Sequence, residues 1–159
     1  DLHRTLGDPH HDEGDLVAGR GMRLPMDLGT VSIDGGVPLV FVAHMVATTR
    51  RNGRLWGSRT VTAMNGSFLG ADNLGPRAHP NDGRLDVVDG TLPRTERATG
   101  RRRAATGTHL PHPDLVERRT AHHVIESARP LHVRLDGIQV GSGHRLEITC
   151  HPDAWIAVV

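Results

Sequence analysis

Hydrophobic and polar residues alternate in short runs along this chain, and glycine or proline interrupts them roughly every eight to fifteen residues. The clearest run covers residues 131–135, where Leu131, Val133 and Leu135 alternate with polar residues. Alternation of this kind puts one set of side chains on each face of a strand, so we expect these three to face a core. Many short strands between regular turn signals are typical of a sandwich or barrel.

Other runs predict further strands, over residues 28–33, 37–47, 60–64, 84–88, 138–140, 146–150 and 155–159. Turn residues separate these runs, at Asp34-Gly35-Gly36, Asn52-Gly53, Asn65-Gly66, Pro80-Asn81-Asp82-Gly83 and Asp136-Gly137. An Asp-Gly pair between alternating runs is the strongest of these signals and predicts a hairpin. We therefore expect a mostly β fold, a two-layer β-sandwich with one or two short helices.

Helical signals occur at two places in the sequence. In residues 1–7, Leu2 and Leu6 lie four apart and Gly7 follows, which indicates the end of a helix. Residues 94–105 favour a second short helix, although Gly100 weakens it. Residues 1–21 therefore look like a helix end and an acidic linker after an upstream domain, and residues 22–159 like the sandwich.

Composition narrows the classes of protein. The 159 residues suffice for one domain and contain no apolar run long enough to span a membrane and no signal peptide. The single cysteine, Cys150, excludes an internal disulfide and favours a reducing, cytoplasmic location. A net charge of +1 and 3% aromatic residues argue against nucleic-acid binding.

Three groups of residues are candidates for binding. A tight turn around Asp82 can surround a hard divalent cation with a carboxylate and backbone carbonyls, although composition alone favours a plain turn. The histidine groups offer zinc ligands, but prolines or strand alternation separate their side chains, which disfavours zinc. These groups are His109, His112 and Asp114; His10, His11 and Asp12; and His122 and His123.

The third candidate is a cluster of arginines, namely Arg94, Arg97, Arg101, Arg102 and Arg103. An anionic membrane surface attracts such a cluster, although ordinary solvated charge is the favoured interpretation. No nucleophile elbow, Walker loop, dinucleotide fingerprint or metalloprotease motif occurs in the sequence.

Six short motifs occur in order along the chain. Residues 1–7 match the end of a GTxND-F-x-R-x-L-G pattern, and residues 25–29 contain the DLG that follows it. Asn65 and Gly66 open an N-x-x-x-x-G segment, and residues 76–87 match P-x-A-x-x-x-DG-x-L-D-V.

The remaining two motifs lie in the second half of the chain. Gly107 and His109 open a G-x-H-x-x-H-P segment, and Asp136 and Gly137 stand where a DGE pattern begins. In this order, the six motifs resemble the diacylglycerol and sphingosine lipid kinases, including the bacterial YegS-like kinases.

The resemblance implies a division of labour between two domains. In that family, an N-terminal α/β domain carries a GGDGT site for ATP, and a C-terminal β-sandwich completes the cleft and receives the lipid. This chain resembles the second domain, so ATP would need the first domain, in the same chain or in another. The resemblance leaves a homodimer open.

The resemblance also assigns a weak structural Mg²⁺ to the turn. Asp82 would bind the ion by its carboxylate, the carbonyls of His79 and Arg84 would help, and Asp1 would join through water. The arginine cluster would bind the anionic inner face of the cell membrane, and this membrane would supply the lipid substrate.

Two departures from the family pattern bear on activity. Ile138 stands where the family has the glutamate of DGE, the presumed general base, and isoleucine accepts no proton. The stretch between Phe41 and Asn65 lacks a longer insertion that often helps to form the lipid pocket. We therefore expect the isolated chain to be inactive. The alternative is a catalytically inactive module that binds lipid or protein.

Overall fold

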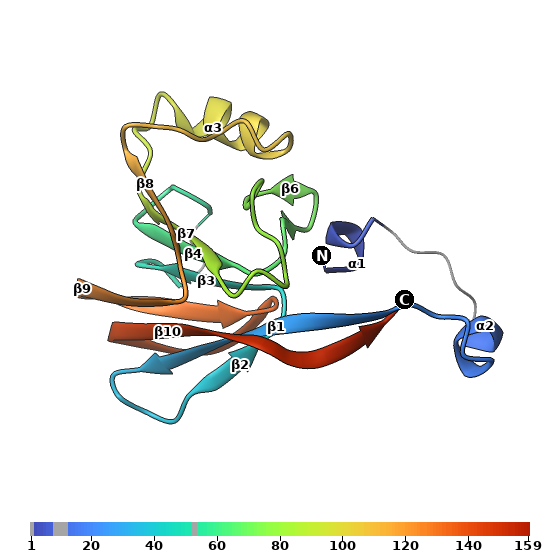
Figure 1. Cartoon of the computed structure of the whole chain (residues 1–159). Coiled ribbons are helices and arrows are strands. Elements are labelled where there is room, and N and C mark those ends of the chain that lie inside the picture. Colours follow the sequence, from blue (N-terminus) through green and yellow to red (C-terminus); the bar gives the residue numbers. More distant parts are fainter. Residues whose placement is uncertain (1, 8–12, 52–53) are drawn as a thin grey trace.

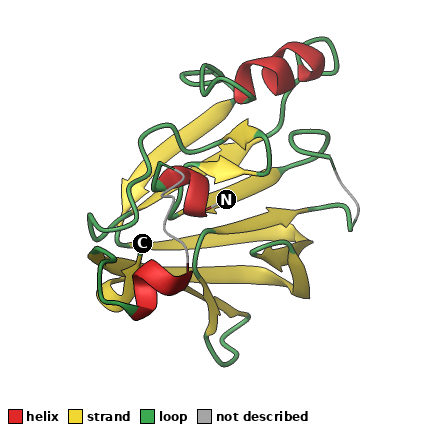
Figure 2. Cartoon of the chain, turned by 90° about the vertical axis from the view of Figure 1, so that its right-hand side faces the viewer, coloured by secondary structure: helices red, strands yellow, loops and turns green. Residues whose placement is uncertain are grey.

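The structure is a computed structural model that describes residues 2–7, 13–51 and 54–159 (Figure 1). The helices are α1 (Leu2–Thr5), α2 (Glu13–Val17) and α3 (Arg97–Ala104). The strands are β1 (Arg23–Ile33), β2 (Leu39–Phe41), β3 (His44–Thr48), β4 (Thr60–Met64), β5 (Phe68–Leu69), β6 (Asp72–Asn73), β7 (Leu85–Gly90), β8 (Leu115–Thr120), β9 (His122–Leu135) and β10 (Ile138–Val158). Figure 2 shows the helices outside the strands.

Eight strands form one antiparallel sheet in the order β2-β1-β10-β9-β3-β4-β7-β8. The sheet bends in the middle, where the β9–β10 pairing passes from Gly143↔Leu131 to Arg145↔Glu126 and leaves four β9 residues unpaired. Extra residues on one strand bend it and increase the local twist. The bend folds the sheet into two layers, with β1, β2 and β10 below β3, β4 and β7 in Figure 1. The expected two-layer β-sandwich is confirmed.

The main core lies between the two layers. Leu131, Val133 and Leu135 are buried there, as the alternation predicts, with Phe41 from β2 and Ile148 from β10. A second cluster of apolar side chains lies beneath α3 and includes Trp56, Leu92 and Leu115. Few aromatic rings take part, so the core consists mostly of aliphatic side chains.

The predicted hairpin at Asp136-Gly137 is confirmed. Asp136 has a φ of 46° and Gly137 a φ of 87°, the left-handed backbone that a tight two-residue turn requires. The turn joins β9 to β10, and Ile138 pairs with Leu135 across it. No helix interrupts residues 131–149.

The prediction of one long strand over residues 37–47 is wrong. The chain forms β2 and β3 instead, which pair with different neighbours, β1 for the first and β4 and β9 for the second. Between them, the backbone N–H groups of Val42 and Ala43 donate to the Asp136 carboxylate. The Asp136 side chain, remote in sequence, therefore accepts the backbone N–H groups that a continuous strand would donate to neighbouring strands.

The helical predictions hold with shorter bounds. Residues 94–105 contain α3. Gly100 is buried in this helix against Leu92, and a Cβ there would lie 2.3 Å from Leu92 Cδ1. The helix end within residues 1–7 is α1, followed by Gly7 at a φ of 85°. The predicted Asn52-Gly53 turn lies outside the described residues.

Candidate functional site

Asp27, a buried residue of β1, organises one end of the sandwich. Its Oδ2 accepts the N–H of Gly83 at 2.6 Å, and its Oδ1 accepts the N–H of Asp153 at 3.1 Å. Its own N–H donates to the Pro80 carbonyl at 2.7 Å. The 80–83 turn is therefore bonded to β1 through both the backbone and the side chain of one aspartate.

Asp82 is half-buried in this turn, and both of its carboxylate oxygens are engaged. Oδ1 accepts the N–H of Arg84 at 3.0 Å, an interaction that favours the turn itself. Oδ2 forms an ion pair with the Arg119 guanidinium on β8. Arg119 Nε also lies 3.8 Å from Asp86 Oδ1, across the β7–β8 pairing. Two carboxylates thus flank one cationic group.

The donor chemistry at this turn suits a cation. Asp86 is buried, and its Oδ2 has no hydrogen-bond partner among the described residues. Burial raises the pKa of Asp86, and the nearby Arg119 charge opposes that rise. Carboxylate oxygens are hard donors of the type that Mg²⁺ prefers, and both Asp82 and Asp86 contact the Arg119 guanidinium. Arg119 supplies the positive charge in this structure.

Asn65 and Gly66 connect the turn region to the first helix. The Asn65 amide donates to the carbonyls of Asp27 and Val42, at 2.9 and 2.8 Å. Ser67, two residues on, donates its N–H to the Thr5 hydroxyl of α1 at 2.9 Å. Asn65 therefore holds β1 and the β2–β3 break together, beside the place where α1 docks. Asp1 lies outside the described residues.

Asp136, of the motif that resembles DGE, has a structural role. Its carboxylate accepts the N–H groups of Val42, Ala43 and His44 at 2.7, 2.9 and 2.9 Å. Its own N–H donates to the His44 carbonyl at 2.9 Å. With so many donors on one carboxylate, Asp136 fixes the hairpin against the β2–β3 break.

Ile138, where the DGE pattern has its glutamate, offers no proton acceptor. Ile138 is 70% exposed at the start of β10. Glu147, which lies nine residues farther along β10, accepts from Arg145 at 2.8 Å and lies 3.2 Å from His122 Nε2. These partners lower the pKa of Glu147, which makes it a weaker proton acceptor than a free glutamate.

His109 packs against Trp56 of the second core cluster and lines a cavity. It is 3% exposed, and its ring lies 5.2 Å from the Trp56 ring. Burial lowers the pKa of His109, which favours the neutral imidazole. The cavity beneath α3 has a volume of about 240 Å³, and Leu92 and Arg103 also line it. Gly107, two residues earlier, has a φ of 71° and ends the turn after α3.

The zinc candidates come together only in part, since His112 and Asp114 are neighbours and His109 lies apart from them. His112 lies 2.6 Å from Glu96 Oε2, and its Nδ1 accepts the N–H of Asp114 at 3.1 Å, so both ring nitrogens are engaged. One ligand atom from each of Glu96, His112 and Asp114 lies within 4.8 Å of the other two, and His109 contributes none. Residues 10–12 lie outside the described residues.

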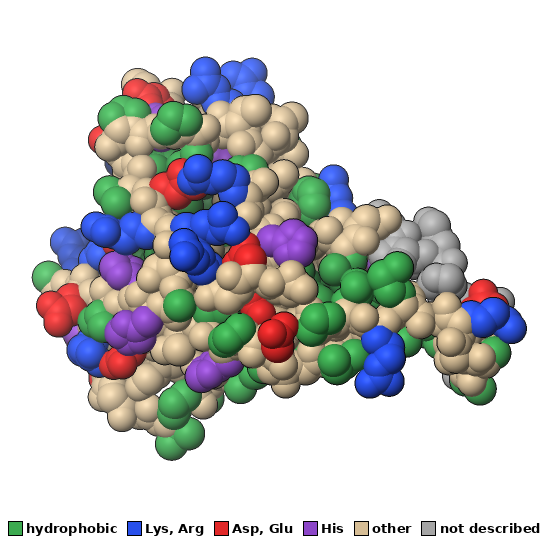
Figure 3. Space-filling view, viewed as in Figure 1, with side chains coloured by type: hydrophobic (Ala, Val, Ile, Leu, Met, Phe, Trp, Pro, Cys, Tyr) green, Lys and Arg blue, Asp and Glu red, His purple; other side chains and the backbone are tan. Residues whose placement is uncertain are grey.

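The arginine cluster lies on and beside α3, where Figure 3 shows basic side chains at the top of the molecule. Arg94, Arg102 and Arg103 are exposed, whereas Arg97 and Arg101 are half-buried. Arg97 donates from Nε to the Leu92 carbonyl at 2.9 Å, which ties it to the loop before α3. No helix in the described part of the chain is long and apolar enough to cross a membrane.

Sequence reasoning included Asp27 and Asp86 only as letters of two motifs and missed their role, and it missed Arg119 altogether. These three residues build the turn from three strands. Asp27 had a signal, because it is the one carboxylate in the mostly apolar stretch 24–28. A buried carboxylate persists in such a strand only if donors surround it. Arg119 had none, because its partners become visible only once β8 pairs with β7.

A two-layer antiparallel sandwich with a buried aspartate beneath an acidic turn thus defines the class of this domain. The family model of the YegS C-terminal NAD kinase beta sandwich-like domain matches residues 29–159. The chain belongs to this family. No curated protein matched the sequence.

Solved structures from Bacillus anthracis str. Sterne have the same fold. One is described as "a putative diacylglycerol kinase", with 16% identity and a TM-score of 0.69 over 98% of this chain. Another, described as a diacylglycerol kinase, has 17% identity and a TM-score of 0.62 over 98% of this chain. This chain spans 63% and 61% of the lengths of those two chains. At this identity the likeness establishes the fold.

Proposed function

We propose that this chain is the C-terminal, lipid-receiving domain of a diacylglycerol kinase-like protein. In this proposal residues 1–21 link the sandwich, residues 22–159, to an α/β nucleotide-binding domain, in the same chain or another. That domain supplies ATP, and phosphate passes to a lipid hydroxyl. The family match supports this assignment, and so do the solved structures of the same fold that are described as diacylglycerol kinases.

The observation that carries the proposal is the docking of α1 against the turn region. Ser67 N–H donates to Thr5, the Arg4 guanidinium lies 4.1 Å above the Phe68 ring, and Arg4 donates to the Gly70 carbonyl at 3.4 Å. The segment that resembles the end of the nucleotide domain's motif is therefore anchored beside Asn65. An upstream domain joined through α1 would face the Asp27–Asp82 end of the sandwich.

The experiment compares three proteins in an assay of ATP-dependent phosphate transfer to diacylglycerol. The first is this chain alone, the second is this chain joined to a GGDGT-type nucleotide domain, and the third is that fusion with Ile138→Glu. We expect no transfer above the blank for the chain alone. A restored general base should raise the fusion's rate by about 10²–10⁴.

Two results would contradict the proposal. Transfer by the isolated chain would show that it carries its own nucleotide site. A fusion that neither transfers phosphate nor binds a short-chain diacylglycerol, even with Ile138→Glu, would favour the alternative of an inactive module. The observation that favours this alternative is Ile138 at the base position. Such an inactive module would bind lipid or protein.

We also propose that the turn binds a weakly held Mg²⁺, with Asp82 and the carbonyls of His79 and Arg84 as ligands and Asp1 joining through water. The ion would compete with Arg119 for the Asp82 carboxylate. Arg119→Gln should therefore increase the rise in Tm that Mg²⁺ produces, and Asp82→Asn should remove it. The matched control is Asp34→Asn, in another turn. An equal response of all three variants would exclude this site.

A further inference from the structure

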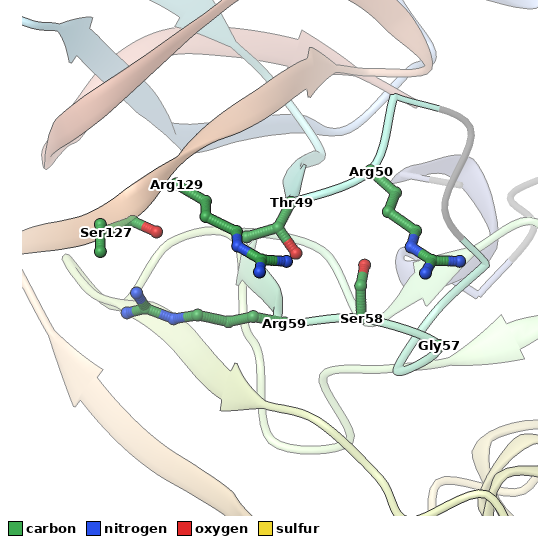
Figure 4. A pocket seen from close by; sticks show the side chains of 8 residues that line it. Thr49, Arg50, Gly57, Ser58, Arg59, Ser127 and Arg129 are labelled. Atoms are coloured by element: carbon green, nitrogen blue, oxygen red, sulfur yellow. The ribbon is translucent and has the colours of Figure 1, made fainter.

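A hollow of about 490 Å³ opens at the end of β3 and β4 that is remote from Asn65. Three segments line it, namely Thr49–Arg50, Gly57–Arg59 and Ser127–Arg129 (Figure 4). We call it the arginine hollow. β3 and β4 pair over five residues between this end and the Asn65 end, a length of about 15 Å. The arginine hollow is therefore separate from the Asp82 turn.

The arginine hollow carries more positive than negative charge. Arg59 is fixed by Asp89, with Nε and Nη2 donating at 2.9 and 2.7 Å, and its Nη1 donates to the Glu126 carbonyl at 2.7 Å. Arg50 and Arg129 are exposed and form no ion pair among the described residues. Asp89 neutralises one of the three guanidinium charges, so two positive charges remain without a counter-charge.

Hydroxyl groups complete the lining. Ser58 Oγ is buried and has no hydrogen-bond partner among the described residues. In Figure 4 it lies between the guanidinium groups of Arg129 and Arg50, and the Thr49 and Ser127 side chains are on the same walls. A buried hydroxyl without a partner is costly, and a bound oxyanion would supply that partner once the Ser58 side chain turns toward it.

The backbone around the arginine hollow is held in place without a ligand. Thr48 Oγ1 donates to the Arg50 carbonyl at 2.7 Å, and Thr60 Oγ1 donates to the Ser58 carbonyl at 3.0 Å. The N–H of Thr49 donates to the Arg59 carbonyl at 3.1 Å, which joins the two walls. Little ordering is left for a ligand to induce, so little affinity is lost on binding.

We propose that the arginine hollow binds a doubly charged phosphate group. Guanidinium groups present planar pairs of N–H donors that match phosphate oxygens, and the uncompensated charge of two matches a phosphomonoester dianion. The Ser58 hydroxyl donates to a phosphate oxygen between Arg50 and Arg129. The group belongs to either a soluble phosphate ester or the headgroup of a phosphomonoester lipid. This inference stands independently of the proposed function.

The first arm of the test uses inorganic phosphate and glycerol 3-phosphate, titrated into the full chain at constant ionic strength and followed by NMR. Arg129→Gln should weaken binding of both at least about tenfold. Arg102→Gln, which removes the same charge from α3, should change binding less than about twofold. Arg50→Gln repeats the test from the other side of Ser58.

Ser58→Ala separates a ligand site from a structural role. Without a ligand, removal of a buried hydroxyl that lacks a partner should leave Tm unchanged or higher. The same substitution should weaken phosphate binding severalfold.

The second arm identifies the source of the phosphate, with phosphatidylcholine vesicles that contain or lack phosphatidic acid. If the ligand is a lipid, Arg129→Gln reduces binding to the phosphatidic acid vesicles and inorganic phosphate competes. If it is soluble, the phosphate compounds bind saturably and the vesicles do not. The proposal is overturned if neither phosphate compound binds saturably, or if Arg102→Gln weakens binding as much as Arg129→Gln.

Discussion

At the residue scale, two aspartates hold backbone donors that the sheet leaves unpaired. Asp27 accepts the N–H groups of Gly83 and Asp153, and Asp136 accepts those of three consecutive residues that begin at Val42. Hydrogen bonds to a charged acceptor are shorter and stronger than neutral ones. These two carboxylates therefore explain the conformation of two irregular segments, the 80–83 turn and the β2–β3 break.

Replacement of Asp136 should destabilise the fold more than any ordinary surface change. Asp136→Ala leaves three N–H groups without their acceptor, and we expect the free energy of unfolding to fall by about 3 kcal/mol. Asp136→Asn keeps one oxygen acceptor and should cost less. Urea denaturation measures both. Glu126→Ala, which removes an exposed carboxylate, should stay within about 0.5 kcal/mol. A loss below about 1 kcal/mol for Asp136→Ala would contradict this role.

Alkaline pH should destabilise the domain through Cys150. Burial, followed by the nearby Asp27 charge, raises the pKa of this thiol from 9.0 to about 12. The chain has neither lysine nor tyrosine, so Cys150 is its one side chain that ordinarily titrates between those values. The unfolded thiol loses its proton near pH 9 while the folded thiol keeps it. The free energy of unfolding should therefore fall from pH 9 toward 12, by up to about 1.4 kcal/mol per pH unit.

Cys150→Ala removes the titrating group and provides the control for this alkaline loss. Its free energy of unfolding, measured in urea at several pH values, should stay nearly level over the same range. An identical slope in the two proteins would assign the alkaline loss to another cause.

At the scale of elements, the short edge strand β2 depends on one glycine of β1. Gly29 pairs with Phe41, whose ring occupies the space that a side chain would need. A Cβ at Gly29 would lie 2.1 Å from Phe41 Cζ. Since Phe41 is fully buried in the main core, its ring has little freedom to move away.

Gly29→Ala should therefore destabilise the protein by about 1–3 kcal/mol, the usual cost of overpacking. The matched control is Gly141→Ala in β10, where the nearest atom, Ile33 Cδ1, would be 3.4 Å from the new Cβ. Thermal unfolding of the two variants compares them directly. If both lose the same stability, the effect belongs to strand glycines in general and not to the Phe41 contact.

At the scale of the whole molecule, basic side chains gather in two separate places, the α3 cluster and the arginine hollow. We expect the α3 cluster to attract anionic vesicles, with about 1 kcal/mol from each exposed arginine near the surface. Binding should fall steeply with salt, because the Debye length shrinks from about 10 Å at 0.1 M to about 3 Å at 1 M. Sedimentation with phosphatidylglycerol vesicles measures it.

Simultaneous replacement of Arg101, Arg102 and Arg103 by Ala should abolish most of this sedimentation. Equal binding to neutral vesicles, or undiminished binding by the triple variant, would leave the cluster as ordinary solvated charge. Arg129→Gln separates the two basic regions, since it changes the arginine hollow and leaves α3 intact.

The sequence by itself determined several of the strands, among them residues 60–64 and 131–135, and which side chains of the second face the core. It did not predict β8 or the break inside residues 37–47. Alternation over residues 131–135 and the Asp136-Gly137 pair act within one segment, since side-chain direction and turn geometry depend on neighbouring residues. The ordered motifs, from residues 1–7 to Asp136, identified the family for the same reason, because each lies within a few consecutive residues. These local features define the fold class and the place of the Asp82 turn.

Only the tertiary structure decided how distant segments meet. The break inside residues 37–47 depends on an aspartate 94 positions away from Val42, and the partner of Asp82 comes from another strand, β8. The arginine hollow combines three segments that are unremarkable individually. Such contacts depend on where the sheet bends and which strands pair, and the pattern along a single segment carries no information about either.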